Sequence, residues 1–349
     1  MYQVEILLEL LRAAVLERQP VISNVEDVDW EELMKSAAAQ GLLAFVWDGI
    51  CMLPKNQQPP RQSMINWGLS AQDAWDNYDL HKSVLEKMVS VCQQNGLRLL
   101  LLKGMGLSAL FPKPQSRPAG DIDIYLFDDY DKGNLLFCDR LINDKGKHSE
   151  MMYQGVFVEN HNNFLEPNTR QKKKIIAYIR SSLNDVRLSD SGYYVLEPMA
   201  NCVFLAFHTL KHFYEGDTIP IRNVLDFAFF LKNNRKEIAT EKFRLVLKQL
   251  ELSKGFELLV CLSEQILKIQ LNEYHFIRFS NRYVASLNSV LLDKDIDTFM
   301  GNVINRLGNK SVSLKKKYAK HIISKYIPRN VPYKSLIIRF VYRIVHGTL

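Results

Sequence analysis

The chain lacks the features that mark membrane-spanning, secreted and disulfide-stapled proteins. No stretch reaches the roughly 18 uninterrupted apolar residues that a membrane span needs. The opening residues lack the basic stretch of a signal peptide, and Glu5 and Glu9 interrupt the apolar pattern that follows. The five cysteines are odd in number and show no CxxC spacing, which favours reduced thiols in a cytoplasmic protein over a disulfide or zinc framework.

Acidic residues are absent from the segment between Lys310 and Leu349, which holds ten Lys and Arg residues. The remaining chain has 35 basic and 38 acidic residues, so the net charge of +7 arises in this segment alone. Residues 1–309 are therefore not basic, and they contain no evident RNA-binding motif of aromatic and basic residues. DNA is not an expected partner, and an RNA-modifying transferase is disfavoured.

The basic segment supports two interpretations. Residues 336–345 mix apolar and basic side chains, with three lysines upstream at 315–317. A helix of this kind can lie on an anionic membrane surface, which would bring a cytoplasmic protein to the inner face of the membrane. It can equally pack its apolar face on the protein and expose its arginines. The pattern leaves both open.

What the chain does contain is a helical beginning followed by a change of pattern. With 47% hydrophobic and 24% charged residues it has the composition of a globular protein. Residues 1–95 follow helical spacing, in which Asp29 is a candidate N-cap. Met64–Cys92 predicts a long helix that ends near Asn95. Leu97–Leu102 is then a short apolar run typical of a buried strand.

The middle of the chain predicts a small sheet, and helices return after it. Asp121–Phe127 has the pattern of a strand, and Tyr130–Asn143 has helical spacing. Ser149–Tyr153 and Gly155–Glu159 predict a hairpin. The clearest later helices are Met199–Tyr214 and Arg222–Leu231, each just after a proline.

We therefore expect an α+β protein with a small mixed-sheet core between helical segments. The expected divisions are a helical N-terminal region (1–95), the core (96–167), a helical region that completes the active-site cleft (168–309) and the basic C-terminal segment (310–349).

Asp121-Ile122-Asp123-Ile124 places two carboxylates one residue apart in an apolar run. In a strand, residues i and i+2 point to the same face, so Asp121 and Asp123 aim together. Two neighbouring anions repel each other unless a cation lies between them, and a divalent metal bound by carboxylate oxygens meets that need. A lone Asp-x-Asp pair is also common at solvated strand ends, so the pair by itself predicts a metal only weakly.

Three segments in this order carry a more specific signal. Leu102-Lys103-Gly104, then Arg117-Pro118-Ala119-Gly120-Asp121-Ile122-Asp123, then Val158-Glu159-Asn160-His161 resemble the bacterial family called uncharacterised nucleotidyltransferase, within the superfamily of DNA polymerase beta-like nucleotidyltransferases. The resemblance spans roughly residues 30–230. One departure is that Met105 follows Gly104 where the superfamily has Ser or Gly.

The resemblance implies an Mg²⁺-dependent transfer of a nucleoside monophosphate from an NTP to an unidentified acceptor, a small molecule or a protein. Asp121, Asp123 and Glu159 would bind a two-metal Mg²⁺ site and be catalytic, and Glu159 could help activate the acceptor hydroxyl. The residues implied to bind the nucleotide are Lys103, Gly104, Gly106, Arg117, His161, His208, His212, Arg222 and Asp226. A catalytically silent nucleotide-binding or interaction module is the alternative function.

Several of these residues also have a structural interpretation. Lys103 can be a solvated lysine at a strand end, Arg117 can pair with Asp121 or Asp123, and His161 can be a hydrogen-bonded structural residue. His208 and His212 share a helix face but lack the Glu of a HExxH zinc motif, so packing is an alternative. Arg222 and Asp226, four residues apart, can form a helix ion pair, and Asp144, Glu150 and Glu166 compete with Glu159 as the third acid.

One mutation tests the carboxylate pair. We expect Asp123→Asn to abolish metal-dependent transfer while leaving the fold intact. Without metal it should even stabilise the protein, because it removes like-charge repulsion.

Overall fold

The computed structural model describes residues 2–144, 146–215 and 219–274. The basic segment 310–349, and with it the choice between membrane contact and packing, lies outside the described residues. Contacts divide the chain into two units, residues 1–207 with 220–277, and residues 208–219 with 278–349. The sheet and the three predicted metal-binding carboxylates all belong to the first unit.

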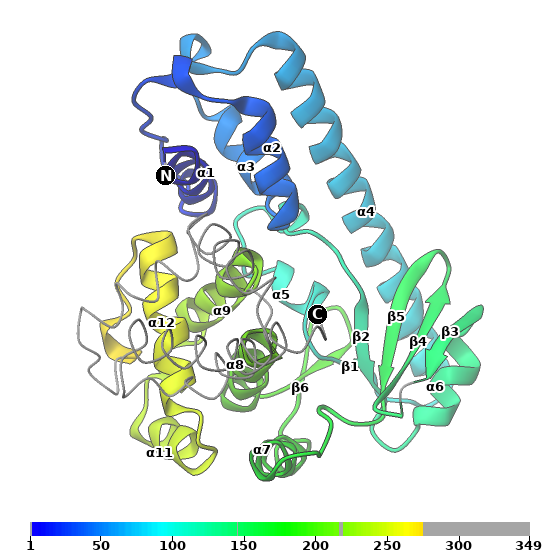
Figure 1. The fold of residues 1–349 in the computed structure, drawn as a ribbon. Coiled ribbons are helices and arrows are strands. Elements are labelled where there is room, and N and C mark those ends of the chain that lie inside the picture. Colours follow the sequence, from blue (N-terminus) through cyan, green and yellow to red (C-terminus); the bar gives the residue numbers. More distant parts are fainter. Residues whose placement is uncertain (1, 145, 216–218, 275–349) are drawn as a thin grey trace, which may run out of the picture. The chain divides into compact units, whose positions relative to one another are not determined.

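The described part is a mixture of helices and one mixed sheet, so the predicted α+β class is confirmed (Figure 1). The helices are α1 (Tyr2–Val15), α2 (Trp30–Ala39), α3 (Leu43–Cys51), α4 (Arg61–Gln94), α5 (Met105–Ser108), α6 (Tyr130–Phe137), α7 (Arg170–Ser181), α8 (Pro198–Glu215), α9 (Ile221–Asn233), α10 (Arg235–Ile238), α11 (Glu241–Gln249) and α12 (Ser253–Leu267). The strands are β1 (Leu100–Leu101), β2 (Ile122–Tyr125), β3 (Arg140–Asp144), β4 (His148–Tyr153), β5 (Val156–His161), β6 (Arg187–Leu188) and β7 (Tyr194–Val195). Within these ranges no helix has the length and apolarity that crossing a membrane requires.

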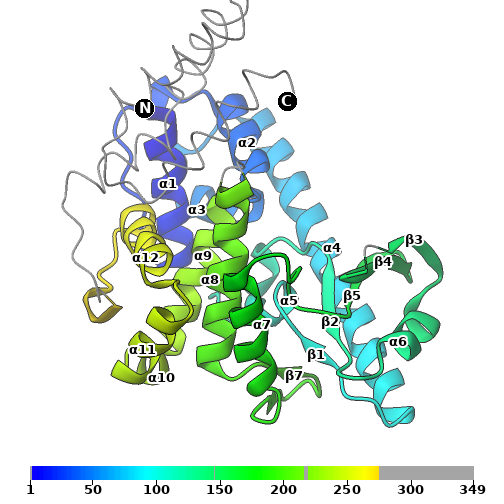
Figure 2. The same cartoon turned by 60° about the horizontal axis from the view of Figure 1, so that its bottom comes forward.

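The helical N-terminal region follows its sequence signals. Asp29 caps α2, since its carboxylate accepts the backbone N–H groups of Glu31 and Glu32. The long helix α4 ends at Gln94, as the pattern predicts. Its second half buries residues such as Met88 in a core shared with β1, β2, β4 and β5, and Figures 1 and 2 both show α4 running beside these strands. This core fixes the sheet on one side.

The sheet has the strand order β3-β4-β5-β2-β1-β7-β6. Strand β2 pairs in parallel with β5 and antiparallel with β1. Of these two neighbours, β1 precedes β2 in the sequence and β5 follows it. The parallel register places Asp123 beside Glu159. Two acids separated by a helix and two strands in the chain therefore become direct neighbours.

The predicted hairpin is confirmed as β4 and β5. Its turn residues, Gln154 and Gly155, both have positive φ (49° and 81°), as a two-residue turn of the type common in hairpins requires. This turn sets the register, which pairs His148 with His161 and Glu150 with Glu159 across the two strands.

The helix predicted over Tyr130–Asn143 is wrong in its second half. Helix α6 ends at Phe137, and Arg140–Asp144 forms β3, which pairs antiparallel with β4. Leu141 and Ile142 suggested a helical face by their spacing, but their side chains are exposed on this edge strand. Because these apolar residues are not buried against the core, their spacing does not distinguish a helix from a strand, which explains the error.

Strand β5 is fastened from behind by α6. The side-chain amide of Asn160 donates hydrogen bonds to the Tyr130 carbonyl and the Asn134 side chain, both at 2.8 Å. Gly133 makes this approach possible, because a Cβ at that position would lie 2.7 Å from the Asn160 amide nitrogen. Since side chains alternate along a strand, Glu159 and His161 face the side opposite to Asn160.

Candidate active site

Three carboxylates meet at the junction of β2 and β5. Asp121 immediately precedes β2, Asp123 lies within it, and Glu159 lies in β5. One oxygen from each can be chosen so that all three lie within 4.8 Å of one another. The structure therefore brings together the three acids that the sequence selected.

Two basic side chains contact this cluster. The Lys103 ammonium lies 2.8 Å from Asp123 Oδ2 and 3.5 Å from Asp121 Oδ2. On the other side, His161 Nε2 lies 3.0 Å from Asp123 Oδ1 and 3.3 Å from Glu159 Oε2. Asp123 is fully buried, and its Oδ2 has the lysine charge beside it but accepts no hydrogen bond of good geometry.

These contacts correct one interpretation of Lys103 and refine that of His161. Lys103 is not a solvated strand-end lysine, since its side chain is only 17% exposed and is paired with carboxylates. His161 is hydrogen-bonded, but to the predicted metal ligands themselves rather than to a remote structural partner. Both residues therefore offset the negative charge of the carboxylates, as a bound metal would.

The carboxylates differ in their titration. Burial and then the Asp123 charge raise the pKa of Asp121, although Lys103 opposes them. Burial would raise the pKa of Asp123 as well, but Lys103 and His161 outweigh it and lower this pKa well below its usual range. Burial acts against the charge of Lys103, yet Asp123 and Asp121 raise its pKa above the ordinary lysine value.

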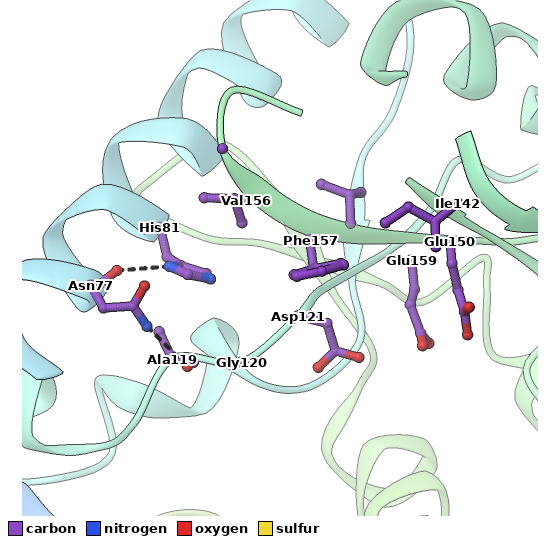
Figure 3. Close-up of a pocket in the computed structure, with 12 residues that line it drawn as sticks. Asn77, His81, Ala119, Gly120, Asp121, Ile142, Glu150, Val156, Phe157 and Glu159 are labelled. Atoms are coloured by element: carbon purple, nitrogen blue, oxygen red, sulfur yellow. Dashed lines mark hydrogen bonds between the residues drawn. The ribbon is translucent and has the colours of Figure 1, made fainter. Parts of the chain in front are cut away.

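The cluster opens into a pocket of about 600 Å³. Figure 3 shows the carboxylates of Asp121, Glu150 and Glu159 pointing to the same side of it. Phe157 and Ile142 supply an apolar wall, and their side chains are 55% and 42% exposed. Phe157 and Glu159 are i, i+2 on β5, so an accessible aromatic ring stands beside the acids.

The turn before α5 comes close to the acids. Gly104 has φ 59° and ψ −116°, a conformation that residues with a side chain rarely adopt. A Cβ there would lie 3.2 Å from the Asp121 carbonyl oxygen. Gly106 is already within α5, where it packs against Leu101 and donates its N–H to the Lys103 carbonyl.

Arg117 does not pair with Asp121 or Asp123 as one interpretation expected. Its guanidinium binds Asp226 through two hydrogen bonds of 2.8 Å, and both side chains are buried. Among the described residues Asp226 pairs with Arg117 and not with Arg222, which corrects the expected helix ion pair. Burial and the Arg117 charge lower the pKa of Arg222. A direct phosphate contact by Arg117 would require this ion pair to open.

His208 and His212 lie in α8, and this helix confirms the predicted one. They belong to the second contact unit, so their expected role at the nucleotide stays a prediction. Arg222 and Asp226 lie in α9, within the first unit, and their nucleotide contacts likewise stay predictions.

Sequence reasoning missed His148, a buried residue whose Nε2 lies 3.2 Å from Glu150 Oε1 and 3.6 Å from Glu159 Oε1. It also passed over Phe157. The signal was available for both, because a two-residue hairpin turn fixes which residues pair and alternation along a strand fixes which share a face.

The fold and site define a class: an α+β protein with a metal-competent carboxylate cluster at a pocket. The family model described as uncharacterised nucleotidyltransferase matches residues 26–268, and the chain belongs to this family. The match includes every residue of the carboxylate cluster and confirms the family predicted from the sequence. Neither a curated protein nor a solved structure matches the chain.

Proposed function

We propose that this chain is an Mg²⁺-dependent nucleotidyltransferase that moves a nucleoside monophosphate from an NTP to an acceptor, either a small molecule or a protein. The observation that carries the proposal is the convergence of Asp121, Asp123 and Glu159, of which Asp121 and Glu159 line a large pocket. The family match supports the reaction class. A polymerase-beta-like fold and a bacterial source remain predictions from the resemblance.

The donor set fits a hard divalent cation. It consists of carboxylate oxygens, which Mg²⁺ prefers, and the buried Asp123 Oδ2, 2.8 Å from the Lys103 ammonium, accepts no hydrogen bond of good geometry. Asp121, Asp123 and Glu159 would hold the metal. When bound, Mg²⁺ supplies positive charge that polarises the phosphoryl group and its attacking and leaving oxygens.

The chain's own residues then have distinct tasks. A bound metal would compete with Lys103 for Asp123. The Lys103 ammonium, released from this ion pair, would then be available to the negatively charged triphosphate. The turn at Gly104 lets backbone approach the phosphates without a side chain in the way. Glu159, at the pocket wall, can accept the proton of the acceptor hydroxyl.

Phe157 is suited to hold the planar part of the nucleotide. Its exposed ring lies on the same face of β5 as Glu159, and stacking of a base on an aromatic ring contributes about 1–3 kcal/mol. Phe157→Ala should therefore weaken NTP binding about tenfold or more, measured by calorimetry. Leu135→Ala, which removes another exposed apolar side chain, one outside the pocket lining, is the control.

The deciding experiment has two stages. Calorimetry measures binding of each NTP with and without Mg²⁺, and a pyrophosphate-release assay then measures turnover with pooled small-molecule and protein acceptors. Mg²⁺-dependent binding with pyrophosphate release supports the proposal. NTP binding without pyrophosphate release in any pool indicates a silent nucleotide-binding module. No NTP binding at all contradicts the proposed function.

The basic segment 310–349 is proposed as an accessory contact of a cytoplasmic protein with the inner membrane face. The proposal rests on its charge and apolar pattern alone. Truncation before Lys310 should leave a stable protein that no longer sediments with anionic liposomes. A destabilised truncation, or an intact protein without salt-sensitive liposome binding, contradicts it.

A further inference from the structure

A second group of potential metal ligands lies next to the carboxylate cluster. His148, Glu159 and His161 each offer one atom, and these atoms lie within 4.8 Å of one another. Both histidines are only 4% exposed, and they face each other across the β4–β5 pair with ring centroids 5.1 Å apart. The hairpin register, not a loop, brings them together.

The spacing of these donors suits a small first coordination shell. A tetrahedral metal with bonds of about 2.0–2.1 Å holds its donor atoms about 3.3 Å apart. The observed separations reach different oxygens of the Glu159 carboxylate: Oε2 lies 3.3 Å from His161 Nε2, and Oε1 lies 3.6 Å from His148 Nε2, so this carboxylate bridges the two rings. Glu150 Oε1 lies 3.2 Å from His148 Nε2, but Glu150 is not one of the three residues whose donor atoms come together.

The surroundings orient the rings for this purpose. His161 Nδ1 lies 3.4 Å from the Asn163 carbonyl, a contact that directs Nε2 toward Glu159. A backbone carbonyl on the far nitrogen is the usual partner of a metal-binding imidazole. His148 Nδ1 is buried and has no hydrogen-bond partner, so packing and the Nε2 hydrogen bond to Glu150 hold this ring in place.

We infer that His148, Glu159 and His161 form a binding site for a borderline divalent transition metal such as Zn²⁺, distinct from the Mg²⁺ position. Imidazole nitrogens favour this class of ion, whereas Mg²⁺ prefers oxygen donors. Glu159 belongs to both groups of ligands, so the two positions are adjacent and share one carboxylate. The inference concerns metal binding alone and holds whether or not the chain transfers nucleotides.

The test uses Co²⁺ as a visible probe, titrated into the full-length, chelator-treated protein in excess Mg²⁺. The excess keeps Mg²⁺ on the oxygen cluster and leaves the nitrogen-containing site to Co²⁺. We expect one equivalent of Co²⁺ with d–d absorption, which Zn²⁺ removes and further Mg²⁺ does not. Absence of this absorption in the wild-type protein overturns the inference.

Three variants locate the site. His148→Asn should weaken Co²⁺ binding at least tenfold, whereas Asp121→Asn, which alters only the oxygen cluster, should retain the absorption. His81→Asn is the matched control, because His81 is another buried histidine, which lines the neighbouring pocket and lies outside the ligand group. Unchanged binding in His148→Asn contradicts the site. If that variant does not fold, Glu159→Gln, which removes the carboxylate donor of the group, replaces it, and an unchanged spectrum counts against the site.

Discussion

Two buried charged clusters of this protein are balanced in different ways. Arg117 and Asp226 form a closed pair in which one guanidinium satisfies both oxygens of one carboxylate. In the other cluster, Asp121, Asp123 and Glu159 share a single lysine and two histidines, and the lysine is the only permanent positive charge among these partners. The first cluster is complete within the chain, whereas the second has more negative than positive partners.

The difference separates support from chemistry. In the closed pair the two side chains already satisfy each other, so the pair is not expected to bind a ligand. Its contribution is to hold the segment before β2 against α9. An underbalanced cluster costs stability unless a cation joins it, and such a cost is usually retained where a ligand binds. The sequence alone makes Arg117 and Lys103 equal candidates for a phosphate ligand. The structure distinguishes them, because Arg117 pairs with Asp226 and Lys103 pairs with Asp123.

The largest expected effect is that of Asp123→Asn. Mg²⁺-dependent nucleotide turnover should fall by about a thousandfold or more, because the proposed metal loses a buried carboxylate ligand. The structure also reverses the expected effect on stability. Asp123 compensates the charge of Lys103 and His161, so its neutralisation should cost about 3 kcal/mol of unfolding free energy without metal. Pyrophosphate release and urea denaturation in chelator measure the two effects.

Asp131→Asn, an exposed acid of α6, is the control for that variant. It should change neither quantity. An Asp123→Asn protein with normal turnover would remove Asp123 from the proposed chemistry.

Breaking the closed pair should affect stability more than metal binding. Arg117→Met leaves the Asp226 carboxylate buried without a partner and should cost about 3–5 kcal/mol. Adding Asp226→Leu should restore most of this loss, since apolar side chains of similar volume can replace a buried pair. Denaturation of the two single variants and the double variant measures the coupling. Loss of Mn²⁺ binding in the stable double variant would show that the two clusters are not independent.

Gly104 should be more sensitive than Gly106. Ala at 104 must adopt a positive φ and approach the Asp121 carbonyl, at a cost of about 1–3 kcal/mol, and should weaken NTP binding as well. Ala at 106 meets only the flexible Leu101 side chain and is helical, so it should change stability by less than about 1 kcal/mol. Thermal unfolding and NTP titration of both proteins test this. Equal effects would mean that the turn backbone has no special role.

The smallest expected effect is a gain. Lys103→Met removes the ammonium that competes for Asp123, so Mn²⁺ should bind the nucleotide-free protein on the order of tenfold more tightly. Affinity for the triphosphate should fall at the same time. Paramagnetic resonance of free Mn²⁺ measures the first quantity, with the exposed Lys132→Met as control. Weaker Mn²⁺ binding would show that Lys103 supports the metal rather than replaces it.

Local patterns predicted most of the architecture. Caps, apolar runs and the turn at Gln154 and Gly155 are determined by neighbouring residues, so α2, α4 and the β4–β5 hairpin could be predicted. The strand β3 could not, because its apolar residues lie exposed on a sheet edge and mimic a helical face. Its place depends on pairing with β4, which a local pattern does not contain.

The same limit applies to the site. The spacing of Asp121 and Asp123 shows that they share a face, and the family resemblance adds Glu159. The partner of Arg117 lies 109 residues away, and no spacing rule reaches that far. Likewise, burial of Asp123 against Lys103 depends on the packing of β1, α5 and β2. The sequence therefore does not predict which basic side chain pairs with which carboxylate at the site.

The placement of Lys103 has a consequence for how the protein matures. Many metal sites form only when the ion is present, so that folding waits for the metal. Here an ammonium attached to the chain already lies between Asp121 and Asp123. A newly made polypeptide would then complete its sheet in a cell depleted of divalent ions and bind the proposed Mg²⁺ afterwards. Supply of the ion would govern when the protein becomes active, and not how much of it accumulates.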